Sequence, residues 1–194
     1  MKIILLSGKA RHGKDTAAEF LKEALEADGY SVLIAHFADL LKYICKTFFG
    51  WDGVKDDLGR KTLQYVGTDV IREKQPDYWV DFLLSVLKLF PNEWDYVLIP
   101  DCRFPNELEK TRGSGVDTLC LRVERPGFVN GLTPEQQNHP SETAMDGVAA
   151  DFYILNDGSV ETLRRKIAEL VVEMNGAHQT TLFETLPAQD GEER

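Results

Sequence analysis

The stretch that most constrains the fold of this chain is a glycine-bounded loop near its start. It runs over residues 8–16 as Gly-Lys-Ala-Arg-His-Gly-Lys-Asp-Thr, between an apolar run at residues 3–7 and a segment of helical character. Glycines let the backbone curl so that successive N–H groups converge on one anion, and the N-terminus of the following helix adds partial positive charge. Lys14 is placed to reach terminal phosphates as a mobile cation. A strand, such a loop and a helix together predict a phosphate-binding P-loop.

The loop departs from the strict P-loop pattern at one position. Ser or Thr usually follows the lysine and binds magnesium, whereas here Asp15 stands at that position and Thr16 comes next. An ordinary strand-to-helix turn with a solvated lysine is the alternative interpretation. The apolar strand before the loop and the amphipathic helix after it favour the phosphate site.

The composition excludes several classes of function. The chain has 194 residues, a hydrophobic content of 43% and a net charge of −10, which suits one core and one domain. The acidic balance argues against binding to a nucleic-acid backbone, which requires a basic face. Cys45, Cys102 and Cys120 lack metal-ligand spacing and suit a reducing compartment. Because we find no signal peptide and no membrane-spanning run, we expect a cytoplasmic protein that binds neither nucleic acid nor membrane.

Apolar runs alternate with segments of helical spacing along the chain. The runs lie at residues 3–7, 31–36, 95–101, 118–123 and 152–155. Near-continuous hydrophobicity is typical of parallel strands that are buried on both faces. The pattern therefore predicts an α/β fold, namely a P-loop NTPase three-layer sandwich with a five-stranded, mainly parallel sheet, a helical substrate-binding insertion and a lid segment.

The spacing of the runs also divides the chain. We expect a single P-loop domain over residues 1–175, followed by a polar and disordered tail over residues 176–194. A helical stretch of roughly sixty residues separates the second and third strands, much more than a minimal crossover needs. The expected parts are a core at 1–36, 95–123 and 150–175, an insertion at about 37–92 and a lid at about 124–142.

Smaller details of the helices can be predicted as well. Gly67 and Thr68 weaken the helix expected over residues 61–73. Asp77 is expected to cap a helix that buries Phe82, and Ser159 to cap the final helix.

Charged residues follow the predicted strands at the edge where open α/β sheets bind ligands. Asp101 ends the third strand, where a carboxylate holds magnesium directly or through water in nucleotide hydrolases and kinases. Arg103 and Arg125 follow the third and fourth strands, and Arg122 is expected to point into solvent. Phosphoryl transfer requires positioned cations and the exclusion of water.

Several stretches resemble the bacteriophage-type deoxynucleoside monophosphate kinases, within the wider P-loop nucleoside monophosphate kinase group. They are residues 13–16 (Gly-Lys-Asp-Thr), 37–42 (Phe-Ala-Asp-Leu-Leu-Lys), 63–68 (Leu-Gln-Tyr-Val-Gly-Thr) with Arg72 and Trp79, 101–107 (Asp-Cys-Arg-Phe-Pro-Asn-Glu), 139–142 (His-Pro-Ser-Glu) and 156–159 (Asn-Asp-Gly-Ser). The run over 101–107 is the most specific, whereas Gly-Lys-Asp-Thr is shared with animal phosphomevalonate kinases. Related kinases also carry a non-hydroxyl residue after the lysine and a threonine next.

The resemblance implies that the γ-phosphoryl group of ATP passes to a deoxynucleoside monophosphate in the presence of Mg²⁺, in the host cytoplasm if the chain is viral. It implies as catalytic residues Lys14, Arg103 and Arg125. It implies as ATP-binding residues Arg11, His12, Gly13, Lys14, Asp15 and Thr16. The acceptor nucleotide would be held by Phe37, Lys42, Gln64, Thr68, Arg72, Trp79, Asp101, Arg103 and Glu142, and the metal by Asp15 and Asp101.

Several of these residues also have a plain structural interpretation. Trp79 has the spacing of a core residue, Arg72 would pair with an acid on its own helix, and Asp101 would cap the following helix. His139 and Glu142 are expected to orient the lid or to cap a helix through Ser141, because phosphoryl transfer needs no nucleophilic side chain.

Two other functions stay open. One is a P-loop kinase for a different phosphorylated small acceptor, of the phosphomevalonate type. The other is a nucleotide-binding switch or ATPase module, which would hydrolyse nucleotide without an acceptor. Arginines distributed over the insertion and the lid favour a second anionic substrate and therefore a kinase. The sequence does not fix which bases are accepted or the assembly state, although the exposed helices of the insertion are compatible with a homodimer.

The predicted role of Lys14 can be tested by mutation. Lys14→Ala should lower the turnover number by at least about a hundredfold, because the cation that neutralises the transferred phosphoryl group is removed. Circular dichroism should show that the fold survives. Normal turnover by the variant would remove Lys14 from the site.

Overall fold

The computed structural model describes residues 1–184, with side chains through residue 174. The strands are β1 (Lys2–Ser7), β2 (Val32–Ile34), β3 (Tyr96–Ile99), β4 (Asp117–Glu124) and β5 (Phe152–Leu155). The helices are α1 (Lys14–Ala27), α2 (Asp39–Phe48), α3 (Asp57–Gln64), the π-helix η1 (Tyr65–Arg72), α4 (Tyr78–Leu89), α5 (Pro105–Gly113), α6 (Pro134–Asn138), α7 (Pro140–Thr143) and α8 (Val160–Glu184).

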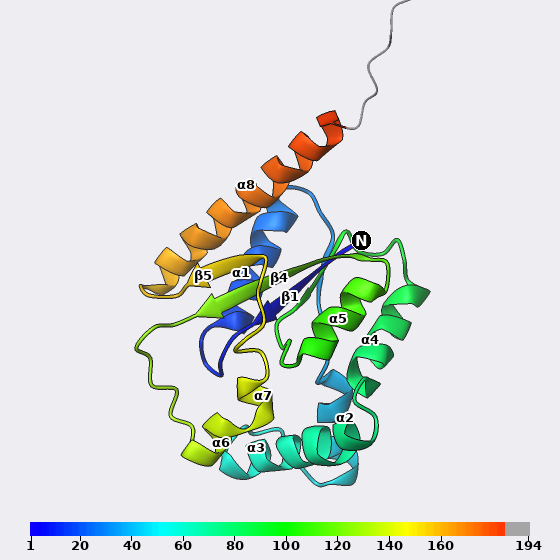
Figure 1. The fold of residues 1–194 in the computed structure, drawn as a ribbon, viewed down its shortest axis with the longest axis vertical. Coiled ribbons are helices and arrows are strands. Elements are labelled where there is room, and N and C mark those ends of the chain that lie inside the picture. The colour runs from blue at the N-terminus through cyan, green and yellow to red at the C-terminus, as the bar shows by residue number, and fades with distance from the viewer. Residues whose placement is uncertain (185–194) are drawn as a thin grey trace, which may run out of the picture.

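The strands form one parallel sheet in the order β2-β3-β1-β4-β5. The central strand β1 lies between β3 and β4, with Ile4 opposite Leu98 on one side and Leu119 on the other. Figure 1 shows β1 and the P-loop that follows it near the middle of the domain. The predicted five-stranded parallel sheet is confirmed, and its order brings the ends of β1, β3 and β4 side by side.

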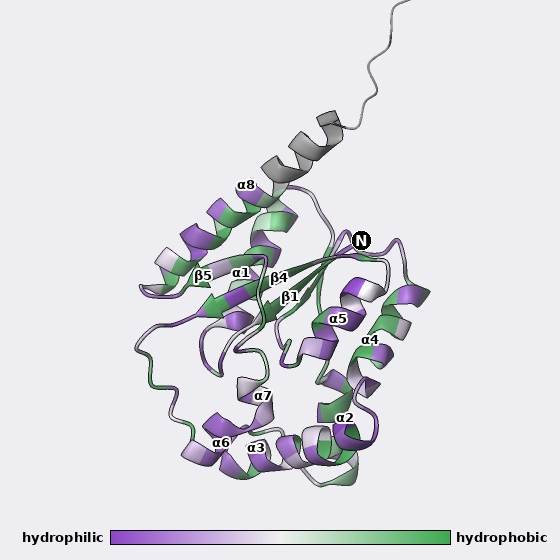
Figure 2. Cartoon of the chain, viewed as in Figure 1, coloured by the Kyte–Doolittle hydropathy of each residue, from purple (hydrophilic) through white to green (hydrophobic). Residues whose placement is uncertain are grey.

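Helices cover both faces of the sheet, as the uninterrupted apolar strands require. Ile4 and Leu6 of β1 pack with α1 and α8, whereas Ile3 and Leu5 pack with α2, α4 and α5. Figure 2 shows the strands as the most hydrophobic part of the chain and the lower helices as mixed. Alternate side chains of each buried strand therefore supply the two cores of a three-layer sandwich.

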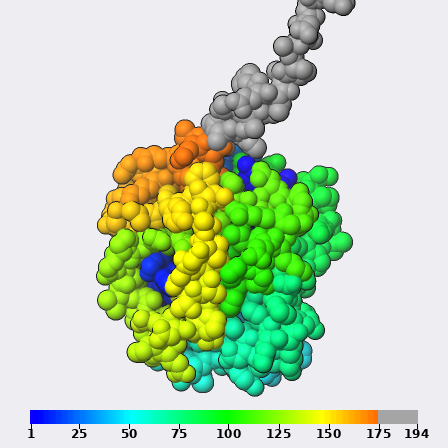
Figure 3. Space-filling model, in the orientation of Figure 1, coloured from blue at the N-terminus to red at the C-terminus, as the bar shows by residue number. Residues whose placement is uncertain are grey.

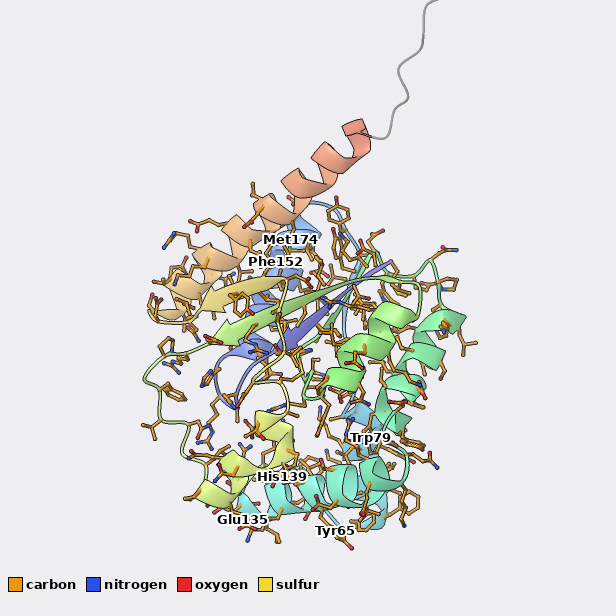
Figure 4. The ribbon with its side chains drawn as sticks, viewed as in Figure 1. Tyr65, Trp79, Glu135, His139, Phe152 and Met174 are labelled. Atoms are coloured by element: carbon orange, nitrogen blue, oxygen red, sulfur yellow. The ribbon has the colours of Figure 1, made fainter. Side chains whose placement is uncertain are left out.

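Helices α2, α3 and η1, which follow β2, form a row below the sheet, whereas α4 lies beside α5 (Figure 1). Gly67 and Thr68, expected to weaken a helix, lie within the eight-residue π-helix η1. π-Helical turns are rare and occur frequently at functional sites. Trp79 of α4, labelled in Figure 4, is buried and its indole N–H donates to the carbonyl oxygen of Gly67 at 3.0 Å. The irregular helix is thus fixed by a side chain of the next helix.

Several predicted details of side chains are wrong, each because of a contact distant in sequence. Asp77 makes no capping hydrogen bond with its helix, because its carboxylate accepts one from the Asn106 side chain at 2.7 Å. Phe82 is 42% exposed. Arg122 is buried, and its guanidinium donates to the carbonyl oxygens of Met145, Asp146 and Val148. The Ser159 cap is confirmed, since its hydroxyl accepts the backbone N–H of Thr162.

The expected lid segment and the expected C-terminal tail also differ from the structure. The segment over residues 124–142 contains the short helices α6 and α7 instead of being irregular throughout. Helix α8 continues through Gly176 to Glu184, where we expected a disordered tail, and residues 185–194 lie outside the described part of the chain. Among the described residues, no helix is both long and apolar enough to cross a membrane.

The close approach of the P-loop to β4 generates a stability prediction. Gly8 has φ +134°, and a Cβ at this position would lie 2.2 Å from the carbonyl oxygen of Val123. Gly8→Ala should therefore lower the free energy of unfolding by about 2 kcal/mol or more, measured by urea denaturation. Gly113→Ala is the matched control, because an added Cβ there meets no atom within 4 Å. Equal stability of the two variants would contradict the prediction.

Candidate active site

The P-loop connects the end of β1 to the first turn of α1. Gly13 adopts the left-handed conformation with φ 98°, directly before Lys14. A side chain at residue 13 would meet the Asn156 side chain at 2.7 Å, and that side chain donates to the carbonyl oxygen of His12 at 3.0 Å. Arg11 also has a positive φ, 61°. The loop thus curls tightly at the N-terminus of a helix, as an anion cradle requires.

Lys14 folds back over this loop. Its ammonium group donates to the carbonyl oxygens of Gly8 and Lys9 at 2.9 and 2.8 Å, and only 5% of the residue is exposed. Burial, followed by the positive charge of Arg103, lowers the pKa of Lys14 to about 7. A bound polyphosphate would restore the charged form, because an adjacent anion favours it.

A cavity of about 320 Å³ lies between the P-loop, the row of helices and the lid segment. Most of the predicted site residues line it: Arg11, Lys14, Asp15, Phe37, Lys42, Gln64, Thr68, Arg72, Trp79, Asp101, Arg103 and Glu142. These residues come from the P-loop, α1, α2 and the segment before it, α3, η1, α4, the segment that follows β3, and α7. The structure therefore gathers the residues named for ATP and for the acceptor around one space.

The other predicted residues lie elsewhere. His12 and Arg125 line a second cavity of about 270 Å³, which Arg103 and Glu142 also border. Figure 3 shows the blue N-terminal segment at the bottom of a hollow between the yellow-green and yellow parts of the chain. Gly13 and Thr16 shape the P-loop and the first turn of α1 but line neither cavity.

Asp101 holds the start of α2 in place. Its two carboxylate oxygens accept the backbone N–H groups of Phe37 and Ala38, both at 3.0 Å. The expected cap on the helix after β3 is therefore wrong. Asp101 instead joins the end of β3 to the end of β2, and each oxygen retains capacity for a further partner.

Arg72 is locked by the segment that follows β3. Its guanidinium pairs with the completely buried carboxylate of Glu107 at 2.5 Å and lies 3.9 Å from the centre of the Phe104 ring. The other oxygen of Glu107 accepts the backbone N–H groups of Arg103 and Phe104. Burial raises the pKa of Glu107 to about 7, although Arg72 acts in the opposite direction. The partner of Arg72 is thus a distant acid, and the expected pairing on its own helix is wrong.

Glu142 ties the lid segment to the P-loop. Its carboxylate accepts the backbone N–H of Ala10 at 2.8 Å and the guanidinium of Arg103 at 2.5 Å. Lys9 donates to the carbonyl oxygen of Glu142 at 2.6 Å and pairs with Asp146. Arg103 is therefore held beside the P-loop by a carboxylate of the lid segment.

His139 lies where the lid segment meets the row of helices. In Figure 4 it lies between α6 and that row. Its Nδ1 atom accepts the backbone N–H of Ser141 at 3.2 Å, and its Nε2 atom lies 3.5 Å from Asp69 of η1. His139 therefore caps α7, and its role in orienting the lid stays a prediction.

Arg125 lines the second cavity, beside the P-loop. Its guanidinium lies 4.1 Å from the centre of the Phe128 ring, and its backbone N–H donates to His12 Nδ1 at 3.1 Å. Burial, followed by the charge of Lys14, lowers the pKa of His12. His12 is consequently a neutral acceptor at pH 7.

His36 connects Asp15 to α2 and was not identified from the sequence. Its ring nitrogens lie 3.5 Å from Asp15 and 3.4 Å from Asp39. Hydrogen bonding to Asp15 and then to Asp39 raises the pKa of His36 to about 9, so the ring is charged at neutral pH. The hydrogen bond with His36 is also the main cause that lowers the pKa of Asp15.

Other residues of the first cavity were also missed: His36, Lys55, Arg60, Phe104, Glu107, Leu132 and Gln136. Phe104 and Glu107 lie inside the specific stretch over 101–107, and His36 follows the second strand. Their positions in the sequence could therefore have identified these three residues as part of the site. Lys55 and Arg60 belong to no recognisable pattern. Gln136 completes a capping box that begins at Thr133, and this pattern could have been recognised.

The carboxylates of Asp15 and Asp101 are the predicted ligands of Mg²⁺. No group of three or more His, Cys, Asp or Glu side chains suited to a metal occurs in the part of the chain that the structure describes. Mg²⁺ in kinases is usually bound by one or two carboxylates together with substrate phosphates and water. Asp15 is exposed beside the P-loop lysine and Asp101 keeps free lone pairs, so this donor set fits such a shared site.

Comparison with known proteins agrees with this arrangement. The family model described as "Deoxynucleotide monophosphate kinase" matches residues 54–167. The deoxynucleotide monophosphate kinase of Enterobacteria phage T4 is 26% identical over 86% of this chain and 97% of its own length. That of Escherichia phage RB69 is 31% identical over 58% of this chain and 44% of its own.

Solved structures resemble the fold. The Mycobacterium tuberculosis APS kinase CysC in complex with AMPPNP and APS is 14% identical, with a TM-score of 0.51 over 88% of this chain and 96% of that one. Shikimate kinase from Aquifex aeolicus is 15% identical, with a TM-score of 0.50 over 91% and 99%. These likenesses establish the α/β fold of P-loop kinases. The family match over more than half of its length shows that the chain belongs to the deoxynucleotide monophosphate kinase family.

Proposed function

We propose that the protein transfers the γ-phosphoryl group of ATP to a deoxynucleoside monophosphate, giving the diphosphate and ADP for DNA precursor synthesis. The first cavity carries the proposal, because it places Lys14 of the P-loop in the same space as side chains of the helices between β2 and β3. Two substrates must meet in line for phosphoryl transfer, and a shared, covered space is what that requires.

In this mechanism the protein positions and neutralises charge. The backbone of residues 8–16 and Lys14 would hold the ATP phosphates, and Arg103 would stabilise charge on the phosphoryl group in flight. Arg125, stacked on Phe128 at the far side of the P-loop, would act from the ATP side. Glu142 keeps Arg103 beside the loop.

The acceptor nucleoside would lie against Phe37, Gln64 and Thr68, all of which line the first cavity. Trp79 is 3% exposed and hydrogen-bonded to Gly67, so it supports the wall of the cavity more than it offers a free stacking face. Asp15 and Asp101 would hold Mg²⁺, which supplies neutralisation of the phosphate charges when bound.

We infer the cellular compartment in which the protein acts from its relatives. The curated relatives are viral, which favours action in the cytoplasm of a host cell. Assembly as a homodimer stays a prediction.

A panel of acceptors tests the activity. With ATP and Mg²⁺, a coupled assay for ADP release should respond to one or more of dAMP, dCMP, dGMP and dTMP, with ribonucleotides and phosphorylated isoprenoid precursors run in parallel. A response only to a phosphorylated isoprenoid would identify the other kinase class. ADP release without any acceptor would identify an ATPase.

The lowered pKa of Lys14 predicts proton uptake on ATP binding. At about pH 8 most of the free lysine is neutral, and the polyphosphate should restore its charge, so about one proton should enter per ATP bound. At about pH 6 the lysine is already charged and uptake should fall toward zero. Calorimetry in buffers of different ionisation enthalpy measures both values.

Lys14→Arg is the control for proton uptake, because a guanidinium stays charged at both pH values. Uptake that is equal at the two pH values, or unchanged in Lys14→Arg, would show that another group titrates.

A further inference from the structure

The carboxylates predicted to bind the metal meet at one turn of the chain. Asp101 accepts two backbone N–H groups of the turn over residues 36–39, both at 3.0 Å. Asp15 lies 3.5 Å from the Nε2 atom of His36, the first residue of the same turn. The backbone N–H of the last residue of the turn donates to the carbonyl oxygen of the first at 3.2 Å, which closes the turn. This one turn between β2 and α2 therefore contacts both carboxylates.

The orientation of Asp15 depends on this turn. Its side chain is 83% exposed, and among the residues whose side chains are described His36 is its only ion-pair partner. An exposed carboxylate samples several rotamers, and restricting it to one of them costs conformational entropy when a ligand binds. Asp101 differs, because backbone N–H groups already hold both of its oxygens. A side chain that holds Asp15 would therefore lower the entropic cost of binding a metal.

The ring of His36 is itself held from its other side. Its Nδ1 atom lies 3.4 Å from the carboxylate of Asp39, which also accepts the backbone N–H of His36 at 3.0 Å. The second oxygen of Asp39 pairs with Lys42 at 2.8 Å. A ring with a carboxylate beside each nitrogen is favoured as the imidazolium, in which both nitrogens are donors. Asp39 thus orients the ring so that Nε2 faces Asp15.

We propose that His36 is a positioning residue for the metal, which holds the carboxylate of Asp15 at the cavity before Mg²⁺ and ATP bind. The inference rests on the proposed kinase function and on Asp15 as a ligand of Mg²⁺. Asp15, His36 and Asp101 all line the first cavity. Asp15 stands where Ser or Thr usually binds the metal. Its carboxylate has one more torsion between heavy atoms than a serine hydroxyl, so a contact from outside the P-loop has more to fix.

Binding of a non-hydrolysable ATP analogue tests the role without turnover. Calorimetry of the full chain measures the Kd of AMPPNP with Mg²⁺ and again in EDTA, and the ratio of the two values is the gain in affinity that the metal provides. His36→Ala should lower this gain by at least about threefold, the size of effect that an exposed ion pair produces. A residue that only stabilises the fold would change both Kd values equally and leave the gain unchanged.

Two substitutions separate the contact with Asp15 from the contact with Asp39. His36→Gln places an amide N–H near the position of Nε2 and should keep most of the gain. His36→Asn places an amide N–H near the position of Nδ1, on the side of Asp39, and should lose the gain as His36→Ala does. Both amides lack the charge of the imidazolium, so a difference between the two variants reports the position of the donor and not its charge.

A double-mutant cycle tests whether His36 acts through Asp15. Asp15→Asn should lower the gain by itself, and adding His36→Ala should lower it no further. Glu19→Gln is the matched control, because it removes an exposed acid one turn further along the same helix, and this acid lines neither cavity. The control should match the wild type.

Three results would overturn the inference. They are an unchanged gain in His36→Ala, equal gains in His36→Gln and His36→Asn, and a full further loss when His36→Ala is added to Asp15→Asn. Failure of the proposed function looks different, because the wild type itself would then release no ADP with any deoxynucleoside monophosphate.

Discussion

The buried carboxylate of Glu107 is the interaction on which the rest of the site depends. One of its oxygens accepts the N–H groups of Arg103 and Phe104, and the other pairs with Arg72 of the π-helix. An ionised group that is removed from water is costly unless all of its partners are in place, and loss of one partner of such a pair costs about 3–5 kcal/mol. This penalty forces the segment after β3 and the row of helices into one relative position. The first cavity lies between them, lined by Arg72 on one side and by Arg103 and Phe104 on the other.

Charge is distributed in two different ways in this protein. Over the whole chain acids exceed bases, which keeps the surface acidic and repels anions at long range. Around the first cavity lysines and arginines converge from elements far apart in the chain, and several are tethered by a single acid, as Arg103 is by Glu142. A local cationic site inside an acidic protein attracts phosphates only at short range. The arrangement therefore concentrates affinity at the cavity instead of spreading it over the surface.

Much of this organisation could be predicted from local patterns. The P-loop was recognisable because glycines and a lysine at fixed spacing follow a strand and precede a helix, and the parallel sheet because its strands are apolar without interruption. The partner of Arg72 could not be predicted in this way. It lies 35 positions along the chain, whereas acids such as Glu73 stand nearby and offered a simpler pairing. Lys55 lies in a loop and Arg60 on helix α3, and both were missed because a single cation carries no periodic signal and its role depends on the residues that surround it.

By itself the sequence determined the fold class, the family and the phosphate-binding loop, because these depend on short-range spacing and on the hydrophobicity of individual strands. Only the tertiary structure decided which cations are neutralised and which stay available to a substrate. It also decided that Asp101 holds the start of α2, that Trp79 closes a wall of the cavity and that Gln136 of α6 contacts Asp57 of α3. The physical reason is that hydrogen bonds and ion pairs act over a few ångströms in space, irrespective of distance along the chain. The chemical type of each residue is known from the sequence, whereas its contact partners depend on how the helices and strands pack.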